Sequence, residues 1–283
     1  MKIAVLSGKG GTGKTFVSVN LAFVADNSNY IDCDVEEPNG HLFFKPKIVN
    51  SEKVYVKIPI IDNDRCSGCR KCIEFCKFNA LAYIKDKVFV FEEICHSCGG
   101  CTLLCPEKAI SEKDKEIGEI LEGVFNNSNI YTGILNTGEQ TGVSIIKKLL
   151  NIVDDKPYTF IDCPPGSSCS VMESIKDADY CILVAEPTLF GVHNFNMVHN
   201  LVKIFNKPFG AVLNKCLDEE NPAEEYCKKN NIKILSKIPY ENELGKLNSN
   251  AEIVSQHQKY YSIFSSLLNT IKEEVKNEAT FNS

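Results

Sequence analysis

A glycine-rich segment near the N-terminus has the residue types that bind phosphate groups. It reads Gly8-Lys9-Gly10-Gly11-Thr12-Gly13-Lys14-Thr15 and fits the pattern G-x-x-x-x-G-K-(S/T). In this pattern the glycines let backbone N–H groups turn toward phosphate oxygens, the lysine reaches the β- and γ-phosphates, and the last hydroxyl ligates Mg²⁺. The segment therefore predicts a nucleoside triphosphate site in which Lys14 contacts phosphate and Thr15 contacts the metal.

Eight of the fourteen cysteines form two runs that repeat with a constant shift of 29 residues. Each run has the spacing C-x₂-C-x₂-C-x₃-C, which is typical of bacterial ferredoxins, where the fourth cysteine of each run binds the cluster of the other run. The spacing predicts two [4Fe–4S] clusters, one held by Cys66, Cys69, Cys72 and Cys105, and the other by Cys95, Cys98, Cys101 and Cys76.

Zinc and disulfide bonds are the alternative explanations for these cysteines. Zinc sites pair two C-x₂-C units and rarely use three evenly spaced cysteines with a fourth, and disulfides are rare in a reducing cytoplasm. Lys77 stands where a proline usually follows the fourth cysteine, whereas Pro106 has that place in the second run. Because proline is not a ligand, this difference leaves the prediction of a cluster unchanged.

Short apolar segments alternate with helix-like segments through most of the chain, and they would position these residues. The phosphate-binding segment follows the apolar run Ile3–Leu6 and precedes Thr15–Ala25, whose apolar residues have helical spacing. Later apolar runs are Tyr158–Ile161, Cys181–Ala185, Phe209–Leu213 and Ile232–Ile238. This alternation is typical of a parallel sheet covered by helices on both faces, so we expect an α/β fold.

The cysteine repeat interrupts this alternation. We expect residues 59–111 to form a small inserted α+β module of the ferredoxin type, within a discontinuous larger domain of residues 1–58 and 112–283. No low-complexity linker flanks the repeat. We therefore expect the module to be docked on the larger domain rather than tethered loosely.

The composition limits the classes of function. The 283 residues include 31 basic and 37 acidic side chains, so the formal net charge is −6, and the hydrophobic share of 43% is ordinary for a globular protein. Only two residues are arginine, so we expect no nucleic-acid partner. No apolar run approaches the ~18 residues of a membrane span, and the first run is too short for a signal peptide. We expect a cytoplasmic protein without membrane insertion.

The second lysine of the phosphate-binding segment indicates a family. Lys9 completes the pattern K-G-G-x-G-K-(S/T), which resembles the deviant phosphate loop of the MinD/ParA/Mrp and nitrogenase iron-protein superfamily. With the cysteine repeat, nearly the whole chain resembles MinD-superfamily ATPases that contain an inserted ferredoxin domain. The resemblance implies a MinD-like P-loop NTPase fold, ATP and Mg²⁺ as ligands, and a homodimer in which Lys9 reaches the partner's nucleotide.

The same resemblance implies roles for residues that follow later apolar runs. Asp34 matches the carboxylate that orients or deprotonates the attacking water, and Asp32 is similar to its companion near Mg²⁺. Asp162 would hold the Mg²⁺ shell, and Gly166 would offer its N–H to the γ-phosphate. The implied catalytic residues are Lys9, Lys14, Asp34 and Asp162.

Three further positions resemble the superfamily less specifically. Asn214 matches the position that contacts adenine, and Pro239 lies in a segment similar to the later base-side loop. Cys169 lies seven residues after Asp162, a spacing similar to that of the nitrogenase iron-protein cysteine that holds a cluster between subunits. Residues 130–142 contain no companion cysteine. We therefore expect Cys169 to be a buried, small hydrophobic residue, with a cluster ligand as the alternative.

The C-terminal segment has an apolar stripe at helical spacing, and we expect a helix over residues 258–276. MinD itself ends in a basic helix that binds membranes. A membrane-binding helix needs an excess of lysine or arginine, whereas the charges around this stripe balance. We therefore expect the helix to pack on the larger domain.

Two functions fit these features. The first is ATP-dependent electron transfer through two [4Fe–4S] clusters to an unidentified redox partner, which full cysteine ligation favours. The alternative is assembly or delivery of iron–sulfur clusters or other metallocofactors to an acceptor protein, as in the Mrp-like relatives. A positioning or partitioning ATPase would explain neither the cysteine repeat nor the balanced C-terminal helix.

Overall fold

A central sheet organises the larger domain of the computed structural model, which describes residues 1–217 and 221–281. Within those residues the sheet has nine strands. In spatial order they are β11 (Ile234–Pro239), β10 (Phe209–Cys216), β9 (Tyr180–Ala185), β1 (Lys2–Leu6), β8 (Tyr158–Asp162), β2 (Ser28–Asp32), β7 (Ser128–Leu135), β6 (Ile110–Phe125) and β3 (Lys47–Ile61). Neighbours from β11 to β7 pair in parallel, whereas β6 pairs antiparallel with both β7 and β3. The expected parallel sheet is therefore extended by two antiparallel strands.

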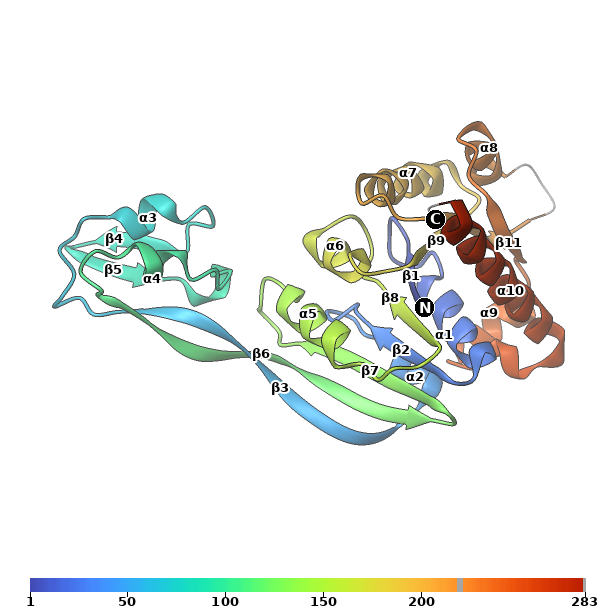
Figure 1. Ribbon diagram of the computed structural model, residues 1–283, viewed down its shortest axis with the longest axis horizontal. Coiled ribbons are helices and arrows are strands. Elements are labelled where there is room, and N and C mark those ends of the chain that lie inside the picture. Colours follow the sequence, from blue (N-terminus) through green and yellow to red (C-terminus); the bar gives the residue numbers. More distant parts are fainter. Residues whose placement is uncertain (218–220, 282–283) are drawn as a thin grey trace.

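Helices cover both faces of the parallel strands (Figure 1). One face packs against α1 (Lys14–Ala25), α2 (Gly40–Phe44), α9 (Asn242–Ser249), the 3₁₀ turn η2 (Val254–Gln256) and α10 (Gln258–Phe281). The other face packs against α5 (Val143–Ile152), α6 (Cys169–Ile175), α7 (Leu189–Ile204) and α8 (Pro222–Lys229). Because both faces are covered, the central strands read as continuous apolar runs rather than as alternating patterns.

The C-terminal helix packs on the domain, as its apolar stripe predicts. Its buried residues recur at helical spacing and belong to the same core as α1. They are Tyr260, Phe264, Leu267, Leu268 and Ile271. Phe264 meets Phe16 of α1 edge to face, with ring centroids 5.6 Å apart. The helix continues to Phe281, five residues beyond its predicted end at residue 276. No helix within the described ranges is long and apolar enough to cross a membrane.

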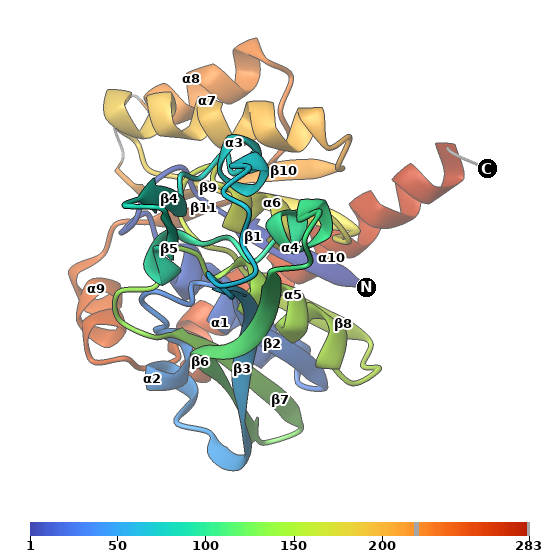
Figure 2. The same ribbon diagram turned by 90° about the vertical axis from the view of Figure 1, so that its left-hand side faces the viewer.

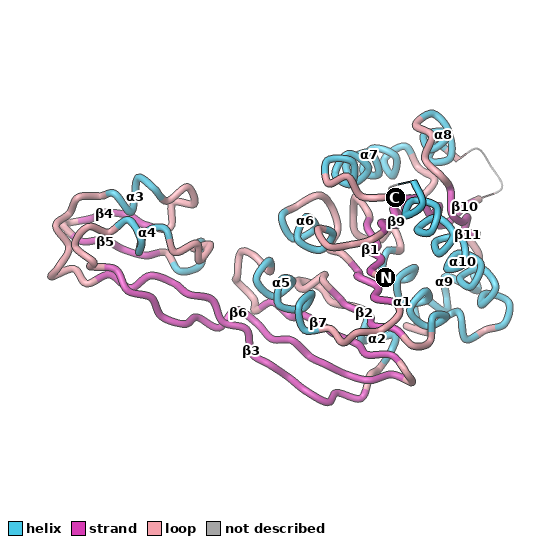
Figure 3. Tube along the Cα trace, viewed as in Figure 1, coloured by secondary structure: helices cyan, strands magenta, loops and turns pink. Residues whose placement is uncertain are grey.

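The inserted module stands at the end of a long two-stranded ribbon. Strands β3 and β6 pair from Lys47 opposite Val124 to Ile61 opposite Ile110, and both extend well beyond the sheet (Figure 3). The module consists of α3 (Lys71–Phe75), β4 (Leu81–Ile84), β5 (Lys87–Val90), the 3₁₀ turn η1 (Glu92–Ile94) and α4 (Gly100–Leu104). The predicted boundaries at 58/59 and 111/112 both fall inside the ribbon strands.

The module was expected to dock on the larger domain rather than be tethered loosely; it stands at the end of the ribbon (Figure 1) and approaches that domain along one edge. Figure 2, viewed from the module end, shows it in front of the larger domain, and Figure 1 shows the ribbon that separates the two. Along one edge the module approaches the larger domain, because residues 95–97 and residues 139–141 line one small cavity. Two hydrogen-bonded strands are stiffer than a free linker, so the ribbon places the module without requiring a broad interface.

Candidate functional site

The phosphate-binding segment forms the loop between β1 and α1. Gly11 and Gly13 have φ angles of 75° and 103°, values that favour glycine. A Cβ at Gly13 would also lie 2.1 Å from Nδ2 of Asn214, and a Cβ at Gly8 would lie 2.0 Å from the carbonyl oxygen of Asn194. These glycines are therefore required by the path of the loop as well as by any ligand.

Side-chain donors hold the carbonyl groups of this loop. The Thr12 hydroxyl donates to the Lys9 carbonyl at 3.1 Å, the Asn214 amide donates to the Thr12 carbonyl at 2.9 Å, and the Lys215 ammonium donates to the Gly11 carbonyl at 2.8 Å. These bonds use carbonyl oxygens rather than N–H groups, which are the groups that bind phosphate at a helix N-terminus.

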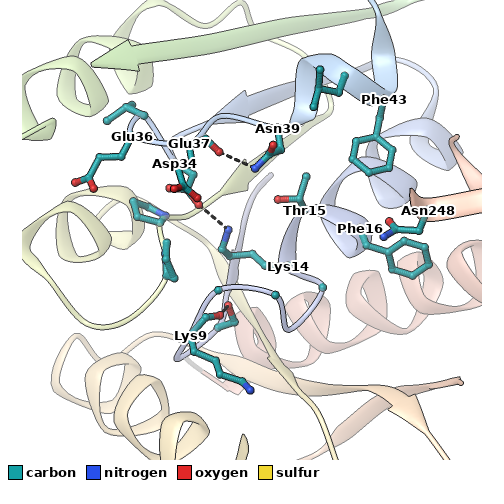
Figure 4. Close-up of a pocket in the computed structure, with 18 of the residues that line it drawn as sticks. Lys9, Lys14, Thr15, Phe16, Asp34, Glu36, Glu37, Asn39, Phe43 and Asn248 are labelled. Atoms are coloured by element: carbon teal, nitrogen blue, oxygen red, sulfur yellow. Dashed lines mark hydrogen bonds and ion pairs between the residues drawn. The ribbon is translucent and has the colours of Figure 1, made fainter. Parts of the chain in front are cut away.

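A cavity of about 660 Å³ opens above the loop (Figure 4). Of the predicted site residues, it is lined by Lys9, Gly10, Gly11, Gly13, Lys14, Thr15 and Asp34. The opposite wall comes from the segment after β2, the prolines after β8 and residues 248–251. Gly8 and Thr12 belong to the same loop but do not line the cavity. The volume and the basic floor are suited to a nucleotide triphosphate tail.

Lys14 is the charged centre of the site. Its ammonium lies 3.3 Å from Oδ2 of Asp34 and 3.4 Å from Oδ1 of Asp162, and its side chain is nearly inaccessible to solvent. Burial opposes the charged ammonium, but the negative charges of Asp162 and Asp34 outweigh this effect and raise the pKa of Lys14. Lys14 therefore remains a cation at neutral pH and can neutralise phosphate charge.

Asp162 is held by a residue that the sequence did not single out. The hydroxyl of Tyr30 on β2 donates to Oδ2 of Asp162 at 2.9 Å, and both side chains are fully buried. Burial raises the pKa of Tyr30, and the charge of Asp162 raises it further, so the phenol stays a donor. Asp162 lies beneath the cavity, where one oxygen faces Lys14 and the other faces Tyr30.

Asp32 holds the backbone of the segment that follows it. Its Oδ2 accepts the N–H groups of Asn39 and Gly40 at 3.0 and 2.9 Å, and its Oδ1 accepts the N–H of Asp34 at 3.2 Å. The side chain is fully buried and does not line the cavity. In this conformation Asp32 orders the Asp34 segment, whereas the sequence suggested a place near Mg²⁺.

Lys9 pairs with a residue of its own chain. Its ammonium forms an ion pair with Glu186, which follows β9, and lies 5.1 Å from the centre of the Phe190 ring. Figure 4 shows its side chain extending away from Lys14 and Asp34. The side chain is 31% exposed. Glu186, like Tyr30, is a site residue that the sequence did not indicate, because it lies far from Lys9 along the chain.

Gly166 and the base-side residues also have partners within the chain. The Gly166 N–H, predicted to meet a phosphate, donates to the Ser7 carbonyl at 2.9 Å. Its φ angle is 88°. Asn214 and Pro239 line a second cavity of about 170 Å³, which shares Gly11, Gly13, Phe16 and Asn248 with the main one. The structure thus brings both predicted base-side residues next to the phosphate loop.

The eight clustered cysteines divide between two cavities of the module. One cavity is lined by Cys66, Cys69, Cys72 and Cys105, and the other by Cys76, Cys95, Cys98 and Cys101. Each fourth cysteine thus lies with the first three of the other run. The Ala80 N–H lies 3.4 Å from Sγ of Cys76, and the Ala109 N–H lies 3.3 Å from Sγ of Cys105.

Each of these donor sets supplies four thiols to one cavity. Within the described residues no three His, Cys, Asp or Glu side chains converge closely enough to hold a single ion. One N–H group lies near the fourth sulfur of each set, and four cysteine thiolates are the ligands that a [4Fe–4S] cluster takes. Zinc would need the four sulfurs at about 2.3 Å from one centre.

Cys169 is exposed, so the prediction that it is buried is wrong. It begins α6, directly after the turn that contains Gly166. Burial was expected because residues 130–142 contain no companion cysteine, and that absence carried no information about the side of the helix on which the thiol lies.

Comparisons with known proteins agree with both parts of the chain. Residues 3–254 match the family described as the CobQ/CobB/MinD/ParA nucleotide binding domain. An uncharacterised protein of Methanocaldococcus jannaschii is 32% identical over 222 residues, which cover 76% of this chain and 80% of that protein. An uncharacterised ferredoxin of the same organism is 36% identical over 55 residues, which cover 18% of this chain and 71% of that protein.

The fold agrees with solved structures. The cell division ATPase MinD of Pyrococcus furiosus superposes with a TM-score of 0.60 at 17% identity, covering 96% of this chain and 98% of that one. At that identity the likeness establishes a MinD-like P-loop fold. With the family match over residues 3–254, it follows that the chain belongs to the CobQ/CobB/MinD/ParA family of nucleotide-binding domains.

Proposed function

We propose that the chain is a dimeric ATPase that couples its nucleotide state to electron transfer through two [4Fe–4S] clusters. The nucleotide would lie over the β1–α1 loop, with its phosphates toward Lys14 and its base toward Asn214 and Pro239. The clusters would be held by the two cysteine sets of the inserted module. When bound, such clusters accept and donate single electrons.

One observation carries the redox part of this proposal. The two cavities combine the cysteines in crossed sets, with Cys76 beside the second run and Cys105 beside the first. Crossed sets tie both halves of the module to both clusters, so each cluster would join the two cysteine runs. Ligation of this kind favours a resident redox group over cargo that must be released.

The residues around the cavity supply the parts that phosphoryl transfer requires. Lys14 neutralises phosphate charge, Thr15 stands at the start of α1 where its hydroxyl can ligate Mg²⁺, and Asp34 lines the cavity where a water could be oriented. Nucleotide binding would draw Lys14 toward phosphate and so change its contact with Asp34. This change would begin the movement of the segment that contains Asp34.

The proposal is tested by anaerobic reconstitution followed by iron analysis and reduction. About eight irons per chain that resist a chelator and are reduced by dithionite would support electron transfer. A protein that retains about two zinc ions, or that loses its iron to the chelator, would contradict it. ATP hydrolysis measured on the same sample tests the nucleotide part separately.

The exposed thiol of Cys169 favours a second function, the assembly or delivery of a metallocofactor. Cys169 is solvent-exposed beside the Gly166 turn. If the subunits of the proposed dimer meet at this turn, two copies of the thiol would come together. Such a thiol could hold a labile cluster between subunits. ATP-dependent transfer of iron to an apo-acceptor, lost in Cys169→Ser, would support this function; unchanged transfer in that variant would exclude Cys169 from it.

A further inference from the structure

One side chain connects the ribbon, the module and the larger domain. Lys115 lies on β6, and its ammonium is 2.9 Å from both carboxylate oxygens of Glu139. It also donates to the carbonyl oxygen of Glu92, at 3.2 Å. Glu139 belongs to the loop between β7 and α5, whereas Glu92 begins the turn that leads to Cys95. The side chains of Lys115 and Glu139 are only 19% and 16% exposed.

The loop that contains Glu139 is held by the residue next to Asp34. The Leu135 N–H donates to the Val35 carbonyl at 2.8 Å. A Cβ at Gly142 would lie 2.2 Å from Cγ2 of Val35, and a Cβ at Gly133 would lie 2.7 Å from its Cγ1. The buried side chain of Val35 therefore packs on Gly133 in β7 and on Gly142 just before α5, on either side of the Glu139 segment. Any displacement of Asp34 and Val35 must be transmitted to it, because packed interiors do not deform without moving their neighbours.

Among the described residues, the contact between the module and the Glu139 loop involves the cysteine set that contains Cys95. Residues 95–97 of the module share a small cavity with residues 139–141 of the larger domain, beside Lys115. The other cysteine set, which contains Cys66, lines a cavity formed entirely by residues 61–110, within the module and its adjoining ribbon ends. A movement of the Glu139 loop would therefore act on the second set first.

We propose that Lys115 is a positioning residue that transmits the nucleotide state of the Asp34 segment to the loop of Cys95, and thus to the cysteine set of Cys76, Cys95, Cys98 and Cys101. This inference rests on the proposed function and specifies its regulation. The path runs from Asp34 through Val35 and the Glu139 loop to Lys115 and the Glu92 carbonyl. By linkage, a change at the Cys95 loop alters nucleotide affinity by the same factor.

Hydrogen exchange of the iron-loaded, full-length protein tests the path. The measurement follows the peptide of residues 92–98 with and without Mg²⁺ and a non-hydrolysable ATP analogue. In the wild-type protein we expect the analogue to change the exchange rate there about threefold or more, a response in the usual range of coupling between sites. In Lys115→Met we expect no change. Glu139→Gln, which keeps the shape of the side chain, gives a second test if the first variant folds poorly.

Lys113 offers a matched control. It lies two residues away on the same strand, and its ammonium is 2.7 Å from the Glu92 carboxylate, but it is 46% exposed. Lys113→Met should respond to the analogue as the wild type does. A full response in Lys115→Met and Glu139→Gln, or an equal loss in Lys113→Met, would overturn the proposal.

Two further measurements on each sample, nucleotide binding by calorimetry and iron content, distinguish failure of the proposed function from failure of the role proposed for Lys115. A wild-type protein that binds no nucleotide or no iron contradicts the proposed function, and this inference with it. A wild-type protein that binds both, yet shows no change in residues 92–98, contradicts the inference alone.

Discussion

The hydroxyl of Tyr30 donates to Oδ2 of Asp162 at 2.9 Å, while Oδ1 of the same carboxylate faces the ammonium of Lys14 at 3.4 Å. Tyr30 lies on β2 and Asp162 on β8. These two strands are neighbours, and Asp32 lies directly opposite Asp162. The carboxylate of Asp162 is thus fixed from two sides before any ligand arrives. Such pre-organisation is what electrostatic catalysis requires.

Tyr30→Phe should lower the stability of the nucleotide-free protein. The ring would keep its packing on Phe44, 5.0 Å between centroids, but the buried Asp162 would lose a donor. We expect the free energy of unfolding to fall by about 1–2 kcal/mol, measured with urea. Tyr55→Phe removes an exposed hydroxyl and is the control. Equal stability of the two variants would show that the Tyr30 bond does not stabilise the site.

Lys14→Ala should abolish ATP turnover. The substitution removes the cation over the phosphates and leaves two carboxylates facing each other, so we expect hydrolysis to fall about 100-fold or more. The assay is phosphate release under anaerobic conditions. Lys228→Ala, on the exposed side of α8, should retain wild-type turnover. Unchanged turnover in Lys14→Ala would refute the assignment of the active site.

Lys9→Ala should separate nucleotide binding from dimer formation. In a single chain Lys9 pairs with Glu186 and not with the residues around Lys14, so we expect nucleotide affinity within about threefold of wild type. If Lys9 acts across the interface, ATP-dependent dimerisation should be lost, as sedimentation velocity would detect. Lys237→Ala is the control. A dimer that persists in Lys9→Ala would remove the role proposed for this lysine in the partner's site.

The stability of the nucleotide-free protein should fall as the pH rises. Burial raises the pKa of Asp32 from 3.8 to about 8, and the charge of Asp162 adds to this effect. The folded protein therefore keeps a proton on Asp32 that the unfolded chain loses above pH 4. The resulting stability is complete below that pH and disappears as the pH approaches 8, by about 1.4 kcal/mol per pH unit at most.

Urea unfolding at several pH values between 5 and 8 measures this slope. Asp32→Asn has no carboxyl to titrate, so its stability should vary less with pH than that of the wild type. Parallel curves for the two proteins would show that Asp32 is already ionised in the folded state.

Pairs of cysteine substitutions distinguish crossed from sequential ligation. If the sets are crossed, Cys76→Ser with Cys95→Ser damages one cluster and should remove about four of eight irons. Cys76→Ser with Cys66→Ser damages both and should remove nearly all. Sequential ligation predicts the reverse pattern of iron content, so the two double variants decide between the arrangements.

The residues that line the cavities could be predicted from the sequence, whereas the residues that hold them in place could not. The phosphate loop and the cysteine runs were recognisable because each is a local pattern with fixed spacing. Tyr30 was missed because a tyrosine in an apolar strand looks like an ordinary residue of the hydrophobic core. Glu186 was missed because its ion pair with Lys9 forms only when distant segments fold together. Nothing near either residue in the sequence marks its partner.

The ribbon was missed for a similar reason. Most residues of β3 and the first few residues of β6 are exposed. Neither strand therefore shows a long apolar run. Their pairing is visible in cross-strand charges, such as Lys57 with Asp114 at 2.9 Å and Lys53 with Glu116 at 3.2 Å. Such pairs can be recognised only when the register is known, since the partners lie about sixty residues apart.

The most direct test of the account is a redox titration of the anaerobically prepared protein, followed by electron paramagnetic resonance, with and without Mg²⁺ and a non-hydrolysable ATP analogue. We expect two [4Fe–4S] signals and a shift of about 30 mV or more in the potential of at least one cluster when the nucleotide binds, which corresponds to about a threefold coupling for one electron. A colourless protein, or two clusters whose potentials are the same with and without bound nucleotide, would contradict it.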